Sequence, residues 1–159
     1  MKLLELMSTN RVAYRLTASD KEGVLKELVQ RCFIQDAENL GLKEEDQSGI
    51  LEVLKERESL GSTGIGDGVA IPHGKFPRLG HLAAGIGIHE GGVDFGALDG
   101  NESQFFVVLL APEDCAGQHL KALARIARLF RDAGFKRRLI DAQTTQELFD
   151  LIAQEDARH

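Results

Sequence analysis

The run QFFVVLLA, residues 104–111, is the stretch of the sequence that decides the fold. Every side chain after the first is apolar, which is typical of a central strand covered on both faces. The run AAGIGIH, residues 83–89, predicts a second strand, and Gly91 and Gly92 predict a turn after it. Three shorter strands are predicted at residues 12–18, 69–71 and 93–95. A sheet of about five strands is therefore expected.

Two helices are predicted between the first strand and the rest of the sheet. Residues 20–36 have one apolar face, and Ser19 with Glu22 forms a capping-box pattern at their start. Residues 43–58 have a second apolar face at helical spacing, and Gly61 follows the end of this helix. Cys32 falls on the apolar side of the first helix, so a buried structural thiol is expected there.

The C-terminal third is predicted to be helical. One helix spans residues 120–131, Gly134 breaks its pattern, and Thr144 caps a last helix whose final residues, 155–159, are expected to fray. The predicted apolar face of the first of these helices consists of Leu120, Leu123, Ala127 and Phe130. Strands flanked by helices at both ends predict an α/β fold, a three-layer sandwich in which a mixed β-sheet has helices on both faces.

Composition limits the function classes. The 159 residues predict one domain, residues 1–159, with its core over residues 12–152. A net charge of -6 gives no electrostatic reason to bind nucleic acid. The basic run Lys136–Arg138 is expected to be a solvated helical face or, if it has a functional role, a docking site for an acidic protein.

No membrane insertion or secretion is expected. No stretch approaches the length of a membrane span, and residues 1–9 are too short and too interrupted for a signal peptide. Cys32 and Cys115 form neither a disulfide framework nor a metal-type spacing, so a reducing compartment is expected. These features predict a cytoplasmic protein.

The segment ERESLGSTGIGDGVAIPHGK, residues 56–75, carries the chemistry. Its glycines suit a loop at positive φ or a loop whose amides approach a phosphate. A P-loop is excluded because Asp67 stands where that motif has lysine, and a dinucleotide fingerprint is excluded because Val69 replaces its third glycine. No cofactor is therefore expected. His73 remains, held between Pro72 and Gly74, and a neutral imidazole nitrogen is a good nucleophile near pH 7.

The same segment resembles the active-site signature of the type-2 IIA domains of the bacterial phosphoenolpyruvate-dependent phosphotransferase system. The matching residues are Glu58, Ile65, Gly66, Val69, Ala70, Ile71, Pro72, His73 and Gly74. The resemblance extends from about residue 12 to about residue 152, and the GSTGIG run is most similar to the nitrogen-regulatory (IIA-Ntr) subgroup. It implies that His73 accepts a phosphoryl group on Nε2, and that Arg57 and His119 stabilise it.

Elementary chemistry agrees with these implied roles. Arg57 and His119 can donate hydrogen bonds to phosphoryl oxygens, and a helix predicted to start just after His119 favours an anion at its N-terminus. Further donors are predicted from the backbone amides of Ser62, Thr63 and Gly64. The simpler alternatives are that Arg57 belongs to a surface ion pair and that His119 caps its helix.

The resemblance also implies partners. The expected donor is an HPr-like phosphocarrier, and the expected outputs are regulatory targets such as kinases and transporters. Two alternatives stay open at this point. A fructose- or mannitol-type IIA would pass its phosphoryl group to the cysteine of a IIB protein. An enzyme of another class would use a metal site built from His73, His81, His89 and His119, although metal-binding motifs such as HExxH are absent.

Overall fold

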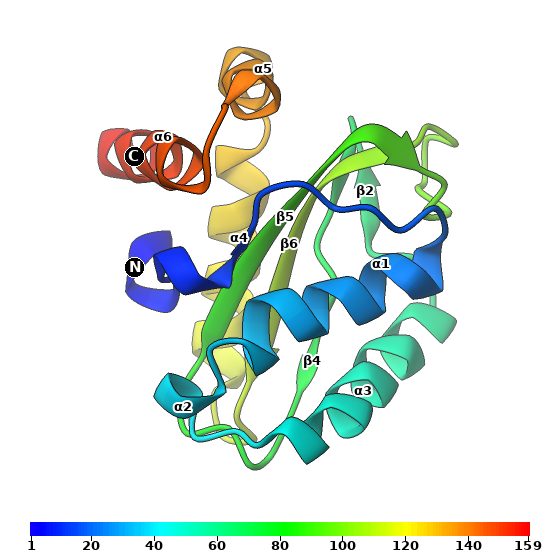
Figure 1. Ribbon diagram of the computed structural model, residues 1–159, viewed down its shortest axis with the longest axis vertical. Helices are drawn as coiled ribbons and strands as arrows, with labels where there is room; N and C mark the ends of the chain where they lie inside the picture. The colour runs from blue at the N-terminus through cyan, green and yellow to red at the C-terminus, as the bar shows by residue number, and fades with distance from the viewer.

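A computed structural model describes residues 1–159 and contains one six-stranded mixed sheet. Its strands run in the order β1-β5-β6-β3-β2, and β4 also pairs with β6 (Figure 1). The strands are β1 Val12–Ala13, β2 Gly64–Gly66, β3 Val69–Ala70, β4 His73–Lys75, β5 Ala83–Val93 and β6 Ser103–Ala111. The predicted central strand is confirmed, because β6 pairs with β5 on one side and with β3 and β4 on the other.

Helices cover both faces of the sheet. The α-helices are α1 Lys21–Leu28, α2 Ala37–Leu40, α3 Gln47–Ser59, α4 Ala116–Leu129, α5 Ala133–Asp141 and α6 Thr145–Arg158. The π-helix η3 Val29–Ile34 continues α1, and short 3-10 helices lie at η1 Leu3–Leu6, η2 Thr9–Arg11 and η4 Glu44–Asp46. In Figure 1, α1 and α3 lie on one side of the β5–β6 pair, and α4, α5 and α6 lie on the other.

Two apolar clusters fill the spaces between these layers. Residues of β6 alternate between them, since Val107 and Leu109 belong to the cluster under α4 to α6, and Val108 and Leu110 belong to the cluster under α1 and α3. This alternation follows from the two-residue period of a strand. The predicted three-layer α/β sandwich is confirmed, with six strands where about five were expected.

The predicted strand ends are partly wrong. Only Val12–Ala13 of the expected strand 12–18 form β1. The Leu16 amide still donates to the carbonyl of Ile88 in β5 at 2.8 Å, and the chain then leaves the sheet where the amides of Thr17 and Ala18 donate to the carboxylate of Glu27 in α1. Gly91 and Gly92 do not form a turn between strands. They lie inside β5, at a register shift that the positive φ of Gly92 (82°) accommodates, and Val93 ends the same strand.

The residue that caps the start of α1 differs from the predicted one. The side chain of Asp20, not the expected Ser19, caps α1 by accepting a hydrogen bond from the amide of Gly23 at 2.7 Å. The predicted burial of Cys32 is confirmed, because Gly85 of β5 leaves room for its side chain. A Cβ atom at residue 85 would lie 2.6 Å from the Cβ of Cys32.

The C-terminal helices differ more from expectation. Thr144 caps α6 as predicted, but the tail does not fray, since Glu155 and Asp156 are buried inside α6. Asp156 accepts hydrogen bonds from Arg125 of α4 and from the amide of Leu4. Gly134 lies in the first turn of α5 rather than breaking a helix. No helix combines the length and the apolar character needed to cross a membrane.

Candidate functional site

His73 is the first residue of β4, at the end of the segment predicted to carry the chemistry. Its Nδ1 lies 2.7 Å from the backbone carbonyl of Ile71. A carbonyl only accepts hydrogen bonds, so this contact fits a ring whose Nδ1 carries the proton. The lone pair of a neutral ring then resides on Nε2, which is the nitrogen available for nucleophilic attack.

Arg57 lies against that nitrogen. It stands in the last turn of α3, and its Nε atom is 3.3 Å from Nε2 of His73. A second guanidinium nitrogen, Nη1, donates to the carbonyl of Gly61 at 2.8 Å. The predicted proximity of Arg57 and His73 is thus present in the structure, and the surface ion pair of the alternative is not formed, because the guanidinium contacts His73 and the carbonyl of Gly61 instead.

His119 completes a cluster of three cationic or titratable side chains. Its ring centroid is 5.4 Å from that of His73, and the two ring planes are inclined by 82°. Nε2 of His119 is buried and has no hydrogen-bond partner. The expectation that His119 precedes its helix is wrong, since α4 begins at Ala116 and the His119 amide donates to the carbonyl of Cys115.

The surroundings keep both rings neutral near pH 7. Burial lowers the pKa of His73 below its ordinary value, and the Arg57 guanidinium lowers it further, against the opposing effects of the Ile71 carbonyl and Glu58. Burial also lowers the pKa of His119, as do His73 and Lys75. A neutral ring at residue 73 keeps its nucleophilic lone pair at physiological pH.

The loop before β2 differs from the predicted row of phosphate-binding amides. The Thr63 amide donates to Oε1 of Glu58 at 3.1 Å, and the Gly64 amide donates to Oγ of Ser62 at 3.0 Å. Both are therefore occupied within the loop, and only the Ser62 amide lacks a protein acceptor. Glu58 is buried and holds this loop, a role that its place in the motif did not reveal.

A partly apolar hollow lies at His73. Arg57, Ser62 and His73 share a shallow hollow with Ile65 of β2 and Leu123 of α4. Sequence reasoning wrongly placed Leu120 in the core. It is 68% exposed, whereas Phe130 of the same predicted face is buried, and Leu123 and Ala127 pack against the core beside the buried Ala122, Ile126 and Leu129.

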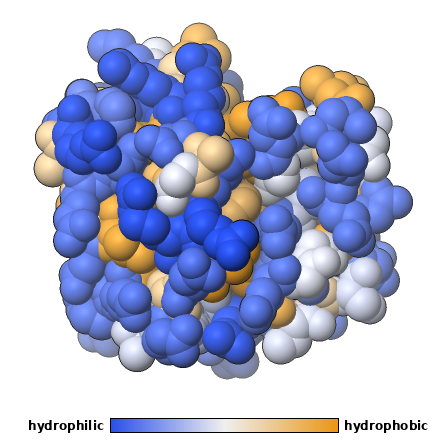
Figure 2. Space-filling model, turned by 90° about the horizontal axis from the view of Figure 1, so that it is seen from above, coloured by the Kyte–Doolittle hydropathy of each residue, from blue (hydrophilic) through white to orange (hydrophobic).

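Leu60, just after α3, is also exposed, and so is Ile65. The face of the molecule seen in Figure 2 is mostly hydrophilic, with apolar areas between the hydrophilic side chains. An apolar rim beside a polar reactive group is typical of a site that meets another protein.

The four histidines of the alternative metal site do not gather. His81 contacts the carbonyl of Leu82, and Nε2 of His89 lies 2.7 Å from the carbonyl of Ala18. The structure contains no group of three or more histidine, cysteine or carboxylate side chains placed to hold a metal ion. Only His73 and His119 lie together.

Comparison with known proteins agrees with this geometry. Residues 5–155 match the protein family described as "Phosphoenolpyruvate-dependent sugar phosphotransferase system, EIIA 2". The chain belongs to this family. The resemblance predicted from residues 56–75 is therefore confirmed for nearly the whole length of this IIA chain, and a general role in phosphoryl transfer follows from the family.

Individual relatives of the IIA chain come from two branches of the system. The nitrogen regulatory protein of Bradyrhizobium diazoefficiens is 35% identical over 153 residues, which are 96% of this chain and 95% of the relative. The fructose-specific EIIABC component of Bacillus subtilis is 31% identical over 156 residues, which are 98% of this chain and 24% of that longer protein. The crystal structure of nitrogen regulatory protein IIA-Ntr from Neisseria meningitidis superposes with a TM-score of 0.82 at 26% identity, covering 93% of this chain and 97% of that one.

Proposed function

We propose that this IIA chain is a phosphoryl carrier that accepts its group on Nε2 of His73 and passes it to another protein. The observation that carries the proposal is the orientation of the His73 ring. Nδ1 is held by the Ile71 carbonyl, and Nε2 faces the Arg57 guanidinium. A fixed tautomer with the second nitrogen beside a cation suits attack on a phosphoryl group, whose transition state carries negative charge on its oxygens.

The proposed step transfers one phosphoryl group between two imidazoles. The Nε2–P bond forms as the N–P bond of the donor phosphohistidine breaks, and the donor imidazole leaves with that bonding electron pair and then takes a proton from solvent. Arg57 exchanges its contact with Nε2 for a contact with a phosphoryl oxygen. His119 donates a hydrogen bond from Nε2, the buried nitrogen that now lacks a partner. Of the three predicted loop amides, that of Ser62 is free to act as a further donor.

The donor in this proposal is an HPr-like phosphocarrier, which docks on the apolar rim formed by Leu60, Ile65 and Leu120. Phosphorylation adds about 1.5 to 2 negative charges to the centre of that rim at pH 7. Such a change abolishes or creates a docking site while the fold stays the same. We further propose that residues 1–159 act as one domain and work in the cytoplasm.

For the output we favour regulation over sugar transport. The nitrogen regulatory protein of Bradyrhizobium diazoefficiens is 35% identical to this chain, against 31% for the fructose-specific EIIABC component, and IIA-Ntr of Neisseria meningitidis superposes on it with a TM-score of 0.82. In the regulatory role, kinases or transporters bind one phosphorylation state of the chain. In the transport role, the phosphoryl group passes to a IIB cysteine. Metal-dependent catalysis gains no support, because the histidines do not gather.

The test of the carrier role is a mass measurement. The chain is incubated with enzyme I, an HPr-type protein and phosphoenolpyruvate, and wild type is compared with His73→Ala and with the control His81→Ala. Wild type and the control are expected to gain one acid-labile phosphoryl group, and His73→Ala none. Equal labelling of His73→Ala would refute the assignment. Transfer onward to a IIB cysteine would favour the sugar branch.

A further inference from the structure

Residues 62 and 63, in the loop beside His73, are held by the carboxylate of Glu58 and the carbonyl of Phe95, and the ammonium group of Lys21 contacts both. Nζ of Lys21, at the start of α1, lies 2.8 Å from Oε1 of Glu58 and donates to the carbonyl of Phe95 at 3.2 Å. The Glu58 carboxylate accepts hydrogen bonds from the amide and the hydroxyl of Thr63. The Phe95 carbonyl accepts a hydrogen bond from Oγ of Ser62 at 2.6 Å. Lys21 therefore touches both groups that fasten residues 62 and 63.

Glu58 depends on a cation. Its side chain is only 5% exposed, and it stands near the C-terminus of α3, where the helix carbonyls disfavour a negative charge. Lys21 provides the only ion pair that Glu58 makes. The ammonium group is itself held in place, since it also lies 4.7 Å from the centre of the Phe95 ring.

Hydrogen bonds connect this loop to His73. The Thr63 carbonyl accepts a hydrogen bond from the Ile71 amide at 3.0 Å, and the Ile71 carbonyl receives Nδ1 of His73. Contacts thus run without a gap from Lys21 through Glu58, Thr63 and Ile71 to the ring nitrogen that fixes the tautomer. A shift of residue 63 would move the carbonyl that orients the His73 ring.

We propose that Lys21 is a positioning residue for phosphoryl transfer, acting through Glu58 and Phe95 on the loop that orients His73. This inference rests on the proposed function of His73. Lys21 does not line the hollow at His73, and it lies in a separate pocket between α1 and α3. Its effect therefore falls on the geometry of the site rather than on partner binding.

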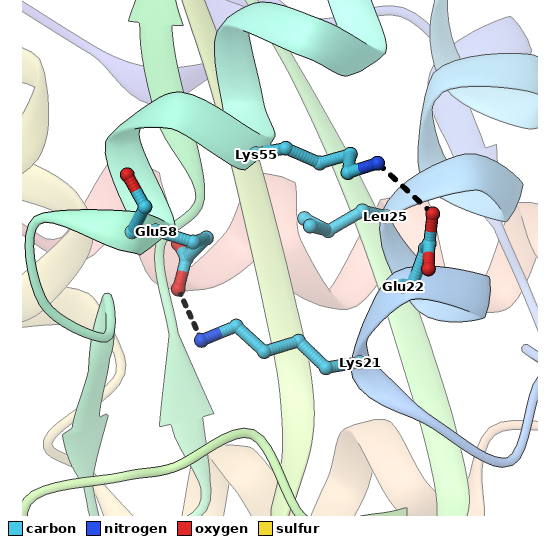
Figure 3. A pocket seen from close by; sticks show the side chains of 6 residues that line it. Lys21, Glu22, Leu25, Lys55 and Glu58 are labelled. Atoms are coloured by element: carbon cyan, nitrogen blue, oxygen red, sulfur yellow. Dashed lines mark hydrogen bonds and ion pairs between the residues drawn. The ribbon is translucent and has the colours of Figure 1, made fainter.

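The same pocket supplies a matched control. Figure 3 shows two ion pairs that both join α1 to α3, Lys21 with Glu58 and Lys55 with Glu22. The Lys55–Glu22 pair spans 3.0 Å, and its side chains are 42% and 68% exposed. Neither of these two residues contacts the loop, so removing Lys55 deletes an equivalent charge without touching the site.

The experiment compares wild type, Lys21→Met and Lys55→Met by two readouts. One is hydrogen exchange of the Thr63 amide, which needs no phosphoryl transfer. The other is the rate of phosphoryl acceptance at saturating phosphorylated HPr-type protein, together with the donor concentration that gives half that rate. Lys21→Met is expected to exchange faster at Thr63 and to accept roughly tenfold more slowly, with the half-saturating concentration little changed. Lys55→Met should behave as wild type.

Two further variants keep the outcome decisive. Lys21→Arg retains the cation and should restore most of the rate. Lys21→Met combined with Glu58→Gln leaves no buried charge, so it should fold even if the single variant does not, yet remain several-fold slow because the Phe95 carbonyl has lost its ammonium donor. Wild-type rates in Lys21→Met or in the double variant would overturn the inference. A wild type that takes no phosphoryl group would instead refute the proposed function, while the exchange readout would still report on Lys21.

Discussion

Adding one methyl group beside His73 should disturb both stability and phosphoryl transfer. In Gly74→Ala, the new Cβ would lie 2.4 Å from Cγ1 of Val53 in α3. Carbon atoms in proteins rest about 3.5–4.0 Å apart, so α3 and β4 must separate by about 1 Å. Val53 cannot easily turn away, because a β-branched side chain in a helix has one strongly preferred rotamer.

Overpacking of this kind costs about 1–3 kcal/mol of unfolding free energy. For a chain of this length, that corresponds to a fall in Tm of roughly 2–4 °C per kcal/mol. The transfer rate should fall as well. Val53 and Arg57 are four residues apart on the same face of α3, so the shift that relieves the clash also moves the guanidinium away from Nε2 of His73. A displacement of about 1 Å at a reacting group can cost up to about a hundredfold in rate.

The assay is a double-mutant cycle with Val53→Ala, which removes the opposing methyl group. Val53 is half-buried, so its truncation alone should cost only about 1 kcal/mol. Urea unfolding and the rate of phosphoryl acceptance are measured for both single variants and for the double variant. The double variant should recover most of the stability and rate lost in Gly74→Ala. If the two changes instead add to within about 0.5 kcal/mol, the steric argument is refuted.

The remaining predictions concern the two histidines. His119→Ala should still accept a phosphoryl group but pass it on slowly, since the buried Nε2 donor is lost; transfer kinetics equal to those of His81→Ala would contradict this role. The pKa of His73 is lowered in the folded chain, so acceptance should stay constant from about pH 8 to pH 6.5 and decline only below that, with the ring titration followed by NMR. The folded chain binds this proton more weakly than the unfolded chain. The contribution of His73 to the unfolding free energy is therefore full above about pH 6.5 and is lost as the pH falls through the folded pKa. A His73 ring that titrates above about pH 6.5 would contradict both the rate prediction and the stability prediction.

The motif and the sheet were predictable because their signals are local. A continuously apolar strand has one favourable place, the centre of the sheet, and β6 occupies it. The face of α4 was not predictable in the same way. Leu123, Ala127 and Phe130 of the predicted face do pack on the core, but α4 also buries Ala122, Ile126 and Leu129 and turns Leu120 to solvent, and spacing alone cannot fix that rotation.

Contacts distant in the sequence explain the other differences. The tail of α6 was expected to fray because its charged residues look solvated, yet Arg125 and Arg138 of other helices pair with Asp156 and Glu155. Glu58 stood in the motif, but its partner Lys21 lies 37 positions earlier, and no local pattern connects them. A buried ion pair becomes visible only when the packing of α1 on α3 is known.

The site explains how one side chain can serve two states of the proposed carrier. Before transfer, Nε of Arg57 contacts the lone pair of His73 Nε2, and its Nη1 donates to the carbonyl of Gly61. After transfer, the same guanidinium can satisfy phosphoryl oxygens without crossing the site. The change between the states is therefore local, and the backbone contacts that fix the ring at Nδ1 need not break. Partners that distinguish the two forms must then respond to the added charge inside the apolar rim rather than to a refolded surface.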